Sequence, residues 1–290
     1  MSLIGNSQPL AYFRRPSGGL AMLAIDQRET MRAMFADAGK GVVTDNDIIE
    51  FKLAALRALT PIASAVLIDQ DFAWGQAIDE RAVAPGCGLI AAVDRFYPRG
   101  DEIVGDSEID ERIDFRELAA DGAKALKLLV IWRPDEPSEK RVSMVDDFIS
   151  RCRAHGLASI IEPVSRKPRS GEGDLDAGII DAARELGNRG QDLYKAEVPF
   201  RRDLNESEVR RRYAQLHRHI ASPWVILSSG VSSDDFAKSL DWACREGAQG
   251  FLAGRAVWKD CIHSSDVALA LRTDAVDRLR RLCEVVDAAV

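Results

Sequence analysis

The sequence predicts a (β/α)8 barrel, an α/β fold in which eight parallel strands alternate with helices. Short apolar stretches recur along the chain, amphipathic stretches of helical period lie between most of them, and the apolar stretches are apolar at nearly every position. Continuous rather than alternating apolar character is typical of parallel strands that are buried on both faces. Eight such units in about 250 residues are the pattern of a closed barrel. A doubly wound open sheet is the alternative architecture.

The expected strands come in order at residues 20–25, 65–69, 88–94, 125–132, 158–162, 192–198, 224–228 and 250–253. Helical periodicity is clearest in the intervening stretches 143–155, 176–186, 206–220 and 234–246. The basic segment 166–173 directly follows a strand end, so we expect it to be a loop of the same domain. Because no Pro-, Gly- or Ser-rich linker divides the chain, we expect one domain over residues 1–290.

Composition and charge limit the class of partner. The chain has 290 residues, of which 46% are hydrophobic, and a formal net charge of −7 with acidic and basic residues interspersed. This balance argues against nucleic acid and anionic membranes as partners. No apolar run approaches the roughly 20 residues that span a bilayer, and the first residues lack the basic and apolar regions of a secretory signal. We expect a small-molecule substrate and a homo-oligomer, although the sequence does not give the number of subunits.

Cysteines and histidines indicate neither a disulfide framework nor a metal site. The five cysteines are odd in number and include no Cys-x-x-Cys pair, so we expect reduced thiols in a cytoplasmic protein. His217 and His219 are two apart on an expected helix and face different sides, while His155 and His263 are isolated. A zinc site would need about three nearby protein ligands. The chain also lacks the glycine-rich nucleotide-binding motifs, and we expect neither a metal nor another cofactor.

Two lysines interrupt strands that are otherwise apolar. Lys195 stands in the run DLYKAEVP (192–199), and Lys127 in the run ALKLLV (125–130). An unperturbed lysine, whose pKa is about 10.4, is almost fully protonated at neutral pH, whereas burial and a nearby like charge favour the neutral amine. A neutral amine can attack a carbonyl group. We therefore predict a nucleophilic lysine; the alternative is that Lys195 forms an ion pair with Glu197, which lies on the same face of the strand.

Polar residues gather at the carboxyl ends of the expected strands, which share one face of a barrel and form its active site. Asp26 follows the first strand and Glu162 ends the fifth, and each begins a polar run. We expect both in the site. Asp69 and Asp94 end the second and third strands, and we expect them to cap the turns that follow.

Small residues follow the seventh and eighth expected strands, in Ser228-Ser229-Gly230 and in Gly254-Arg255. Backbone N–H groups of such loops can approach an anion closely, and an arginine adds a bidentate, charge-assisted contact. We predict a phosphate site formed by Ser229, Gly230, Gly254 and Arg255.

Six short motifs stand in order at these strand ends: DQR (26–28), ALKLL (125–129), IIEP (160–163), DLYK (192–195), LSSGV (227–231) and FLAGRAVW (251–258). Together they resemble the class I aldolase family that contains tagatose-1,6-bisphosphate aldolase and sulfofructosephosphate aldolase, over about residues 17–260. The resemblance implies a (β/α)8 barrel and a ketose-phosphate lyase. The site residues that it implies are Lys195 for the Schiff base, Lys127, Glu162 and Asp26 beside it, and Gly230 and Arg255 for phosphate.

In the mechanism that the resemblance implies, Lys195 attacks C2 of a ketose 1-phosphate, and the resulting iminium allows the C3–C4 bond to break. Glu162 is the expected proton shuttle. Asp26 is expected to orient substrate hydroxyl groups or to share in the proton transfer. Lys127 is expected to favour the neutral amine of Lys195 and to hold a carboxylate or a substrate oxygen.

The far end of the substrate distinguishes the branches of this family. Segments 64–72 and 251–258 are most similar to the sulfofructosephosphate branch, whereas the tagatose branch carries a PEYG-like turn after the second strand from which this chain departs. A sulfonate carries one negative charge and a phosphate monoester about −1.5 to −2, so a sulfonate pocket needs fewer cations and more neutral donors. Gln27 and Arg28 suit a sulfonate. The basic loop 166–169, expected mainly to be solvated, could serve a phosphate instead.

We therefore expect cleavage of 6-deoxy-6-sulfofructose 1-phosphate to dihydroxyacetone phosphate and sulfolactaldehyde, a step of sulfoglycolysis. The first alternative is cleavage of tagatose 1,6-bisphosphate to dihydroxyacetone phosphate and glyceraldehyde 3-phosphate. More distant alternatives are a sugar-phosphate isomerase or epimerase that uses Glu162 and Asp26 as acid and base, and a non-catalytic sensor of sugar phosphates.

Overall fold

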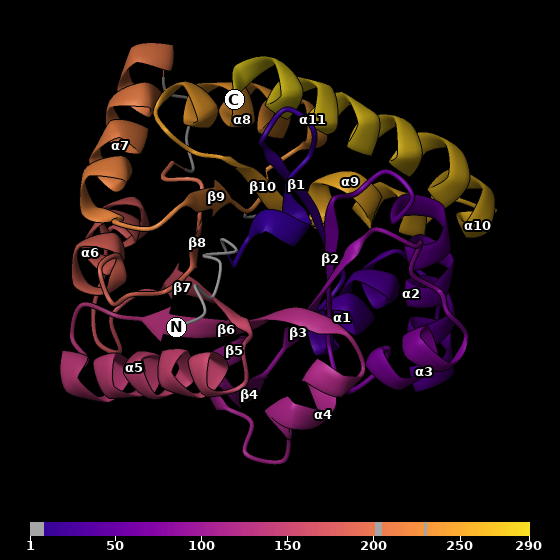
Figure 1. Cartoon of the computed structure of the whole chain (residues 1–290), viewed down its shortest axis with the longest axis horizontal. Helices are drawn as coiled ribbons and strands as arrows, with labels where there is room; N and C mark the ends of the chain where they lie inside the picture. Colours follow the sequence, from indigo (N-terminus) through magenta and orange to yellow (C-terminus); the bar gives the residue numbers. More distant parts are fainter. Residues whose placement is uncertain (1–8, 201–204, 229–230) are drawn as a thin grey trace, which may run out of the picture.

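Eight parallel strands close into a barrel in the order β1-β2-β3-β6-β7-β8-β9-β10 and back to β1. The arrangement is that of a computed structural model that describes residues 9–200, 205–228 and 231–290 (Figure 1). The predicted barrel is confirmed, and the open doubly wound sheet is excluded because the sheet closes on itself. The barrel strands are β1 (Leu20–Ala24), β2 (Ala65–Ile68), β3 (Gly88–Ala92), β6 (Ala123–Trp132), β7 (Ala158–Ser165), β8 (Leu193–Ala196), β9 (Trp224–Ile226) and β10 (Gly250–Ala253).

Helices surround the barrel, with α6 and α7 on one side, α2 and α3 on the opposite side, and α8 and α11 along the top of the view in Figure 1. The helices are α1 (Glu29–Asp37), α2 (Asp45–Leu59), α3 (Trp74–Asp79), α4 (Phe115–Ala120), α5 (Ser138–Ala154), α6 (Leu175–Leu186), α7 (Glu206–His219), α8 (Ser233–Arg245), α9 (Arg255–Trp258), α10 (Val267–Ala270) and α11 (Val276–Ala289). Short 3₁₀ turns lie at Ala11–Phe13 and Lys259–His263, and a π-helical turn lies at Leu271–Ala275.

The four helices expected from periodicity correspond to α5, α6, α7 and α8. Side chains cap the starts of the last three, from Asp174, Asn205 and Ser232. Such caps satisfy N–H groups that have no partner within the helix. Helix α5 begins at Ser138, earlier than expected, directly after Pro137.

An antiparallel hairpin, β4 (Asp94–Arg99) and β5 (Glu102–Ile109), lies between β3 and α4 and is absent from the expected elements. The third barrel strand therefore ends at Ala92, and Asp94 begins the hairpin. The turn contains Gly100 with a φ of 56°, a conformation that glycine adopts without a steric penalty. The sequence PRGD (98–101) between two short polar–apolar stretches is the signal that could have predicted it.

Alternate residues of each strand point into the barrel. The inner layers are apolar and comprise residues such as Leu20, Met22, Leu67, Ile90, Ala125, Ile160, Leu193, Val225 and Leu252. The same alternation places Lys127, Glu162 and Lys195 inside the barrel, because each lies two residues beyond an inward-facing apolar residue of its own strand. The polar residues thus form the uppermost layer of an otherwise apolar interior.

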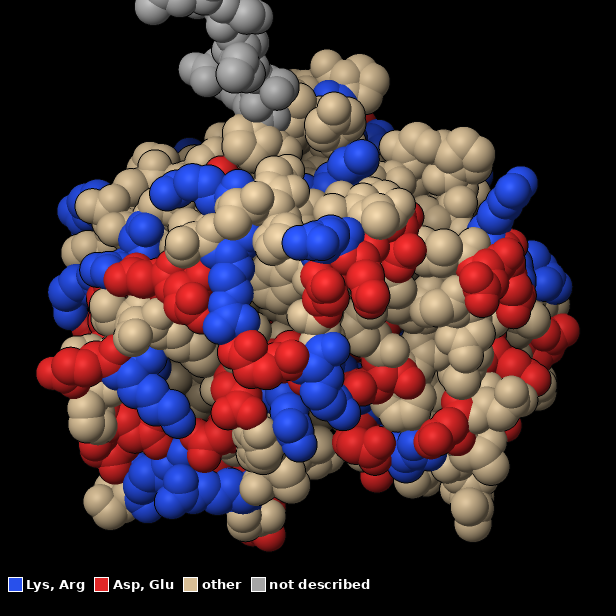
Figure 2. Space-filling model, turned by 60° about the horizontal axis from the view of Figure 1, so that its bottom comes forward, with Lys and Arg blue, Asp and Glu red and all other residues tan. Residues whose placement is uncertain are grey.

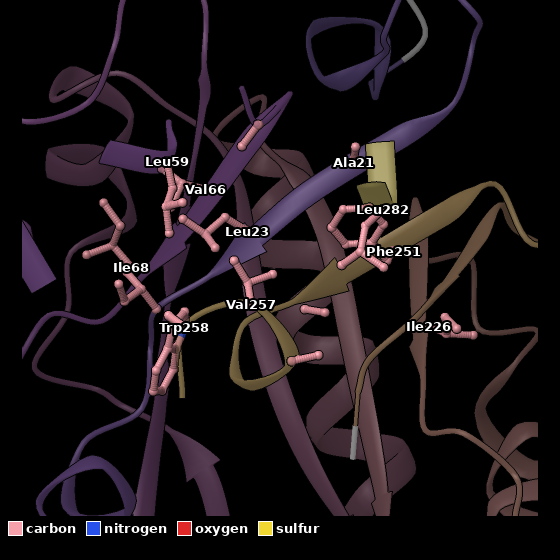
Figure 3. Packing of buried hydrophobic residues seen from close by; sticks show 14 of the residues in the cluster. Ala21, Leu23, Leu59, Val66, Ile68, Ile226, Phe251, Val257, Trp258 and Leu282 are labelled. Atoms are coloured by element: carbon pink, nitrogen blue, oxygen red, sulfur yellow. The ribbon is translucent and has the colours of Figure 1, made fainter. Parts of the chain in front are cut away.

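The opposite faces of the strands pack against the helices. Figure 3 shows Leu23 of β1 beside Val257 of α9, and Ile68 of β2 beside Trp258 of α9. The Trp258 ring also packs edge-on against Phe51 of α2, with the ring centroids 5.6 Å apart. Fully burying an aliphatic side chain such as Leu23 contributes about 1.5–3 kcal/mol. Burial on both faces explains why the strands are apolar at consecutive positions.

Acidic and basic side chains intermingle over the face of the molecule in Figure 2, where neither sign forms a continuous patch. All five cysteines are free, as predicted. Within the described residues, no helix is long and apolar enough to cross a membrane.

Candidate active site

A cavity of about 260 Å³ opens at the carboxyl ends of the barrel strands. This volume is near the lower end for ligand sites and suits a small metabolite. The hairpin forms part of the wall through Phe96 and Val104. The polar and charged side chains that line the cavity are Asp26, Gln27, Thr30, Glu162, Arg166, Glu197, Lys195, Ser228 and Arg255.

Glu162 lies between the two predicted lysines. Its Oε2 accepts a hydrogen bond from Nζ of Lys195 at 2.9 Å and lies 3.3 Å from Nζ of Lys127. All three side chains are buried. The carboxylate that Lys195 contacts is thus Glu162, whereas Oε2 of Glu197 accepts a hydrogen bond from the backbone N–H of Ser165 at 2.7 Å. A proton on Lys195 therefore has a direct path to Glu162.

Lys127 is a fixed cation. The carboxylate oxygens around its Nζ lie at 2.6, 2.8 and 3.3 Å and belong to Asp26, Asp94 and Glu162. Burial by itself would lower the pKa of Lys127, but the three carboxylates together raise this pKa well above its ordinary value. Lys127 therefore remains protonated at neutral pH and stabilises the acidic groups around it.

Asp26 is ionised for the complementary reason. Burial would raise the pKa of its carboxyl group, but the charges of Lys127 and Lys195 and the hydrogen bond from Lys127 hold this pKa well below its usual range. Such a carboxylate is a good hydrogen-bond acceptor and a weak base. Its other oxygen accepts a hydrogen bond from Nε2 of Gln27 at 3.3 Å. Oε1 of Gln27 is buried and has no hydrogen-bond partner among the described residues, so it is available to a ligand.

Asp94, expected to cap a turn, is instead a buried acceptor in this cluster. Its Oδ1 accepts a hydrogen bond from Arg28 at 2.9 Å. Its Oδ2 accepts from Nζ of Lys127 at 2.8 Å and from the backbone N–H of Leu129 at 2.9 Å. The sequence places an acidic residue near a strand end but does not reveal these donors, which come from the loop between β1 and α1 and from β6.

Asp69 does cap its turn, as expected. Its Oδ2 accepts a hydrogen bond from the backbone N–H of Phe72 at 2.9 Å. Its other oxygen pairs with Lys52 of α2, and both side chains are completely buried. This pair holds the loop between β2 and α3 in place.

Arg28, expected to bind substrate, does not line this cavity. It lines a neighbouring cavity of about 450 Å³, which shares Thr30, Phe96 and Val104 with the first. Its guanidinium group donates to the side chain and the backbone carbonyl of Asp94, at 2.9 and 2.7 Å. It also lies 3.2 Å from a carboxylate oxygen of Asp71 and 4.7 Å from the ring centroid of Phe96. The Arg28 side chain points toward Asp94 because the buried carboxylate of Asp94 requires charged partners.

The predicted phosphate site falls partly on described residues. Ser228, Gly254 and Arg255 line the cavity beyond β9 and β10, whereas Ser229 and Gly230 lie outside the described residues. A Cβ atom on Gly254 would lie 2.0 Å from the carbonyl oxygen of Ala24. Glycine at this position therefore allows β10 to approach β1 closely at the mouth of the barrel.

The basic loop 166–169, expected mainly to be solvated and offered as an alternative phosphate contact, contributes one cation to the cavity, Arg166. Arg169 forms ion pairs with Glu136 at 2.6 Å and with Asp106 of the hairpin at 2.8 Å, and Lys167 is exposed. Other lining residues missing from the expected site include Thr30, Phe96 and Val104. The hairpin residues could not be anticipated without the hairpin itself.

Across residues 9–200, 205–228 and 231–290, no group of three or more His, Cys, Asp or Glu side chains is arranged to hold a metal ion. The buried acidic groups of the cluster face lysine and arginine side chains instead.

A family model described as DeoC/LacD family aldolase matches residues 20–260. The chain belongs to this aldolase family. The aldolase is 28% identical to a tagatose 1,6-diphosphate aldolase of Listeria monocytogenes, in an alignment that covers 98% of this chain and 92% of the relative. It is 27% identical to tagatose 1,6-diphosphate aldolase 1 of Enterococcus faecalis, over 84% of this chain and 81% of the relative. It is a lyase of the class I, Schiff-base type.

Solved aldolase structures share the fold at low sequence identity. Fructose-bisphosphate aldolase from Plasmodium falciparum has a TM-score of 0.70 at 14% identity, covering 97% of this chain and 93% of that one. An archaeal fructose-1,6-bisphosphate aldolase, whose catalytic lysine is covalently bound to the carbinolamine intermediate, has a TM-score of 0.65 at 16% identity. The alignment covers 98% of this chain and 100% of the archaeal chain. These likenesses establish the barrel of the aldolase.

Proposed function

We propose that this aldolase cleaves 6-deoxy-6-sulfofructose 1-phosphate to dihydroxyacetone phosphate and sulfolactaldehyde, with Lys195 as the Schiff-base residue. Support for Lys195 comes from its burial inside the barrel, its exposure to the cavity and its 2.9 Å hydrogen bond to Glu162. The residues assigned to catalysis are Lys195, Glu162, Asp26 and Lys127, and those assigned to substrate binding are Gln27, Ser229, Gly230, Gly254 and Arg255.

Covalent catalysis begins when Lys195 transfers a proton to Glu162 and its neutral amine attacks the C2 carbonyl carbon. The carbinolamine oxygen then takes up a proton and leaves as water, which gives an iminium. Removal of the C4 hydroxyl proton breaks the C3–C4 bond, and the bonding electrons flow to the iminium nitrogen. Sulfolactaldehyde departs, the enamine is protonated at C3, and hydrolysis releases dihydroxyacetone phosphate and free Lys195.

The acid–base roles follow from the surroundings of the two carboxylates. Glu162 contacts the amine directly and can pass its proton to the carbinolamine oxygen. Asp26 keeps its charge because its pKa lies well below the usual range, so it suits hydrogen bonding to substrate hydroxyl groups better than proton uptake. Lys127 fixes both carboxylates through contacts at 2.6 and 3.3 Å. In this assignment Glu162 is the proton shuttle, and Asp26 orients the hydroxyl groups of the substrate.

Each of the two arginines that line the cavity is the proposed partner of one anionic end of the substrate. Arg255 follows β10 and is the proposed phosphate contact, together with the backbone around Gly254. Arg166, at the end of β7, and the neutral side chains of Gln27 and Thr30 also line the cavity and are the proposed partners of the sulfonate. A sulfonate needs only one positive charge because it carries one negative charge.

The observation that carries the substrate proposal is the small number of cations among the described residues that line the cavity. Among the lining residues that the structure describes, Arg166 and Arg255 are the cations besides Lys195. Lys127 and Arg28 do not line the cavity and are paired with carboxylates, and Nε of Arg166 itself lies 4.0 Å from a carboxylate oxygen of Glu102. A bisphosphate would bring a charge of about −3 to −4, whereas a sulfonate with one phosphate brings about −2.5 to −3. The lower charge fits this cavity better.

The second candidate substrate is tagatose 1,6-bisphosphate, which is favoured by the names of the relatives from Listeria monocytogenes and Enterococcus faecalis. The reaction would follow the same Schiff-base steps and would differ only in the second anionic group. Sulfoglycolysis, a cytoplasmic location and a homo-oligomeric state remain predictions from the sequence.

Two experiments test the proposal. Borohydride reduction in the presence of dihydroxyacetone phosphate should add the mass of one triose phosphate, less one water and plus two hydrogens, to the peptide that contains Lys195. Lys195→Arg should abolish both labelling and turnover because a guanidinium group stays protonated. Lys238→Arg, at an exposed position of α8, is the matched control and should behave as the wild type. Labelling at another lysine would contradict the assignment of Lys195.

A panel of substrates tests the specificity. The value of kcat/KM should be higher for 6-deoxy-6-sulfofructose 1-phosphate than for tagatose or fructose 1,6-bisphosphate. Gln27→Ala should reduce activity on the sulfonated substrate more than activity on the bisphosphates. A preference of the wild-type protein for tagatose 1,6-bisphosphate would establish the second candidate instead.

A further inference from the structure

We propose that Asp94 and Arg28 form a positioning pair that fixes the catalytic cation Lys127 and ties it to the β4–β5 hairpin. Neither residue lines the cavity, so the pair acts on the reaction through Lys127 and not by contact with substrate. This inference rests on the proposed role of Lys195 and adds two residues to the machinery around it.

The carboxylate of Asp94 is a rigid anchor. Its side chain is fully buried, and both of its oxygens accept hydrogen bonds, Oδ1 from Arg28 and Oδ2 from Lys127 and from the backbone N–H of Leu129. Arg28 also donates to the backbone carbonyl of Asp94 at 2.7 Å. The carboxylate cannot rotate without breaking charge-assisted hydrogen bonds in a buried site, where each broken bond is costly.

This anchor determines how the protons of Lys127 are shared. An ammonium group has three N–H donors, and three carboxylates surround it, with Glu162 the most distant at 3.3 Å. If Asp94 were absent, a donor would be released and could turn toward Glu162. A shorter contact there would compete with Lys195 for the same oxygen, Oε2 of Glu162. Asp94 thus keeps Glu162 available to the nucleophile.

The same pair connects the cluster to the wall of the cavity. Asp94 is the first residue of β4, and Phe96, two residues later, lies under the guanidinium group of Arg28 and lines the cavity. Asp71, from the loop after β2, approaches the other side of that group at 3.2 Å. Arg28 therefore holds the hairpin against the barrel at the point where the hairpin meets the site.

Asp94→Asn tests the pair, because it keeps the shape of the side chain and removes one negative charge. The charged groups around the two lysines are Asp26 from the end of β1, Asp94 from β4, Glu162 from β7 and Glu197 beyond β8, with Arg28 behind Asp94. Loss of the Asp94 charge leaves an excess of positive charge, which disfavours the protonated amine of Lys195. We expect kcat/KM to fall about 100-fold and the acid limb of its pH profile to move to lower pH by roughly half a unit to one unit.

Arg28→Gln provides the opposite test and remains informative if Asp94→Asn does not fold. It removes a positive charge and leaves the Asp94 carboxylate in place, so the acid limb should move to higher pH while kcat/KM falls. A purely structural role would lower the melting temperature of both variants without moving the limb in either direction. That result would overturn the proposal.

Glu185→Gln is the matched control. Glu185 of α6 pairs with the buried Arg141 at 2.9 Å and accepts a hydrogen bond from Trp132, and it does not line the cavity. This variant should be less stable, with an unchanged pH profile. Borohydride labelling of the wild type at Lys195 is measured in parallel. Absence of that label would contradict the proposed function. If Lys195 is labelled but the acid limb of the pH profile does not move in Asp94→Asn and Arg28→Gln, only the positioning pair is contradicted.

Discussion

Two buried lysines have different surroundings at the mouth of the barrel, and the difference suits different tasks. Lys127 is enclosed by three carboxylates and lies outside the cavity lining, so it keeps its charge. Lys195 has one carboxylate partner and faces the cavity, where a carbonyl group can reach it. Glu162 lies between the two lysines and is the proposed acceptor of the proton that Lys195 must lose before it attacks a carbonyl group.

Arg255 is the residue on which the phosphate proposal depends most directly. Arg255→Ala should weaken binding of dihydroxyacetone phosphate and of ketose phosphates by about 2–3 kcal/mol, the scale for a lost charge-assisted contact. Isothermal titration calorimetry on a variant that cannot form the Schiff base would measure the loss. Arg280→Ala, at an exposed position of α11, removes the same charge away from the site and should bind normally. Unchanged affinity in Arg255→Ala would place the phosphate elsewhere.

Asp26 makes part of the folding stability sensitive to acid. Its pKa is held below the value of about 3.9 that an unfolded chain has. The unfolded state therefore binds the proton first as the pH falls, and the stabilisation present at neutral pH is lost below about pH 4. Between pH 6 and pH 3, the free energy of unfolding should fall by about 1 kcal/mol more in the wild type than in Asp26→Asn. Denaturant titrations at the two pH values measure this difference, and equal losses would show that Asp26 is not responsible.

At the scale of elements, the site depends on how closely β10 approaches β1. Gly254 directly follows β10 at the place where the two strands approach each other. There, Nε1 of Trp258 donates a hydrogen bond to the carbonyl oxygen of Ala24 at 3.0 Å. A Cβ atom on residue 254 would lie 2.0 Å from that oxygen and 2.7 Å from the indole nitrogen. The ends of the two strands carry Asp26 and Arg255, so their spacing sets the width of the cavity.

Gly254→Ala should therefore cost about 1–3 kcal/mol of stability, because a buried backbone contact must open. It should also weaken phosphate binding. Gly75→Ala in α3 is the matched control, because no atom lies within 4 Å of the added Cβ and its φ is not positive. Alanine there should stabilise the helix by about 0.5–1 kcal/mol. Thermal denaturation of both variants gives the comparison, and equal effects would mean that the contact with Ala24 is unimportant.

At the scale of the whole molecule, both signs of charge mix on the face seen in Figure 2, whereas a compact group of opposite charges is buried at the mouth of the barrel. The formal net charge of the chain is −7. The buried cluster has three carboxylates, from Asp26, Asp94 and Glu162. They face three cationic groups, which come from the loop after β1, from β6 and from β8. A barrel brings these ends together at one face, which no smaller unit of the chain could do.

The whole enzyme should be insensitive to chelators. The iminium accepts the electrons that a metal ion would otherwise stabilise, and the buried carboxylates of the site are occupied by cationic side chains. We expect EDTA treatment followed by removal of the chelator to leave kcat and KM unchanged. Loss of activity that zinc restores would contradict the Schiff-base assignment. A chelator-treated metal-dependent aldolase provides the positive control.

The sequence by itself determined the barrel and much of its polar upper layer. Strand apolarity and helical periodicity are local properties, and the strand period of two places Lys127, Glu162 and Lys195 on inward faces once the strands are parallel. Asp26 and Gly254 were found for the same reason, since residues at strand ends meet at one face of any barrel. The extent of the domain and the identity of the second anion stay predictions.

The tertiary structure decided which of these groups are partners. Asp94 and Arg28 could not be paired from the sequence, because a buried charge selects its counter-ion by distance and not by position along the chain. The same is true of Phe96 and Val104, which reach the cavity through a hairpin whose strands pair with each other and form ion pairs with residues distant in the sequence, such as Arg28 and Arg169. The sequence pattern of a strand determines the direction in which a side chain points, whereas closure of the sheet into a barrel determines which residues that side chain contacts.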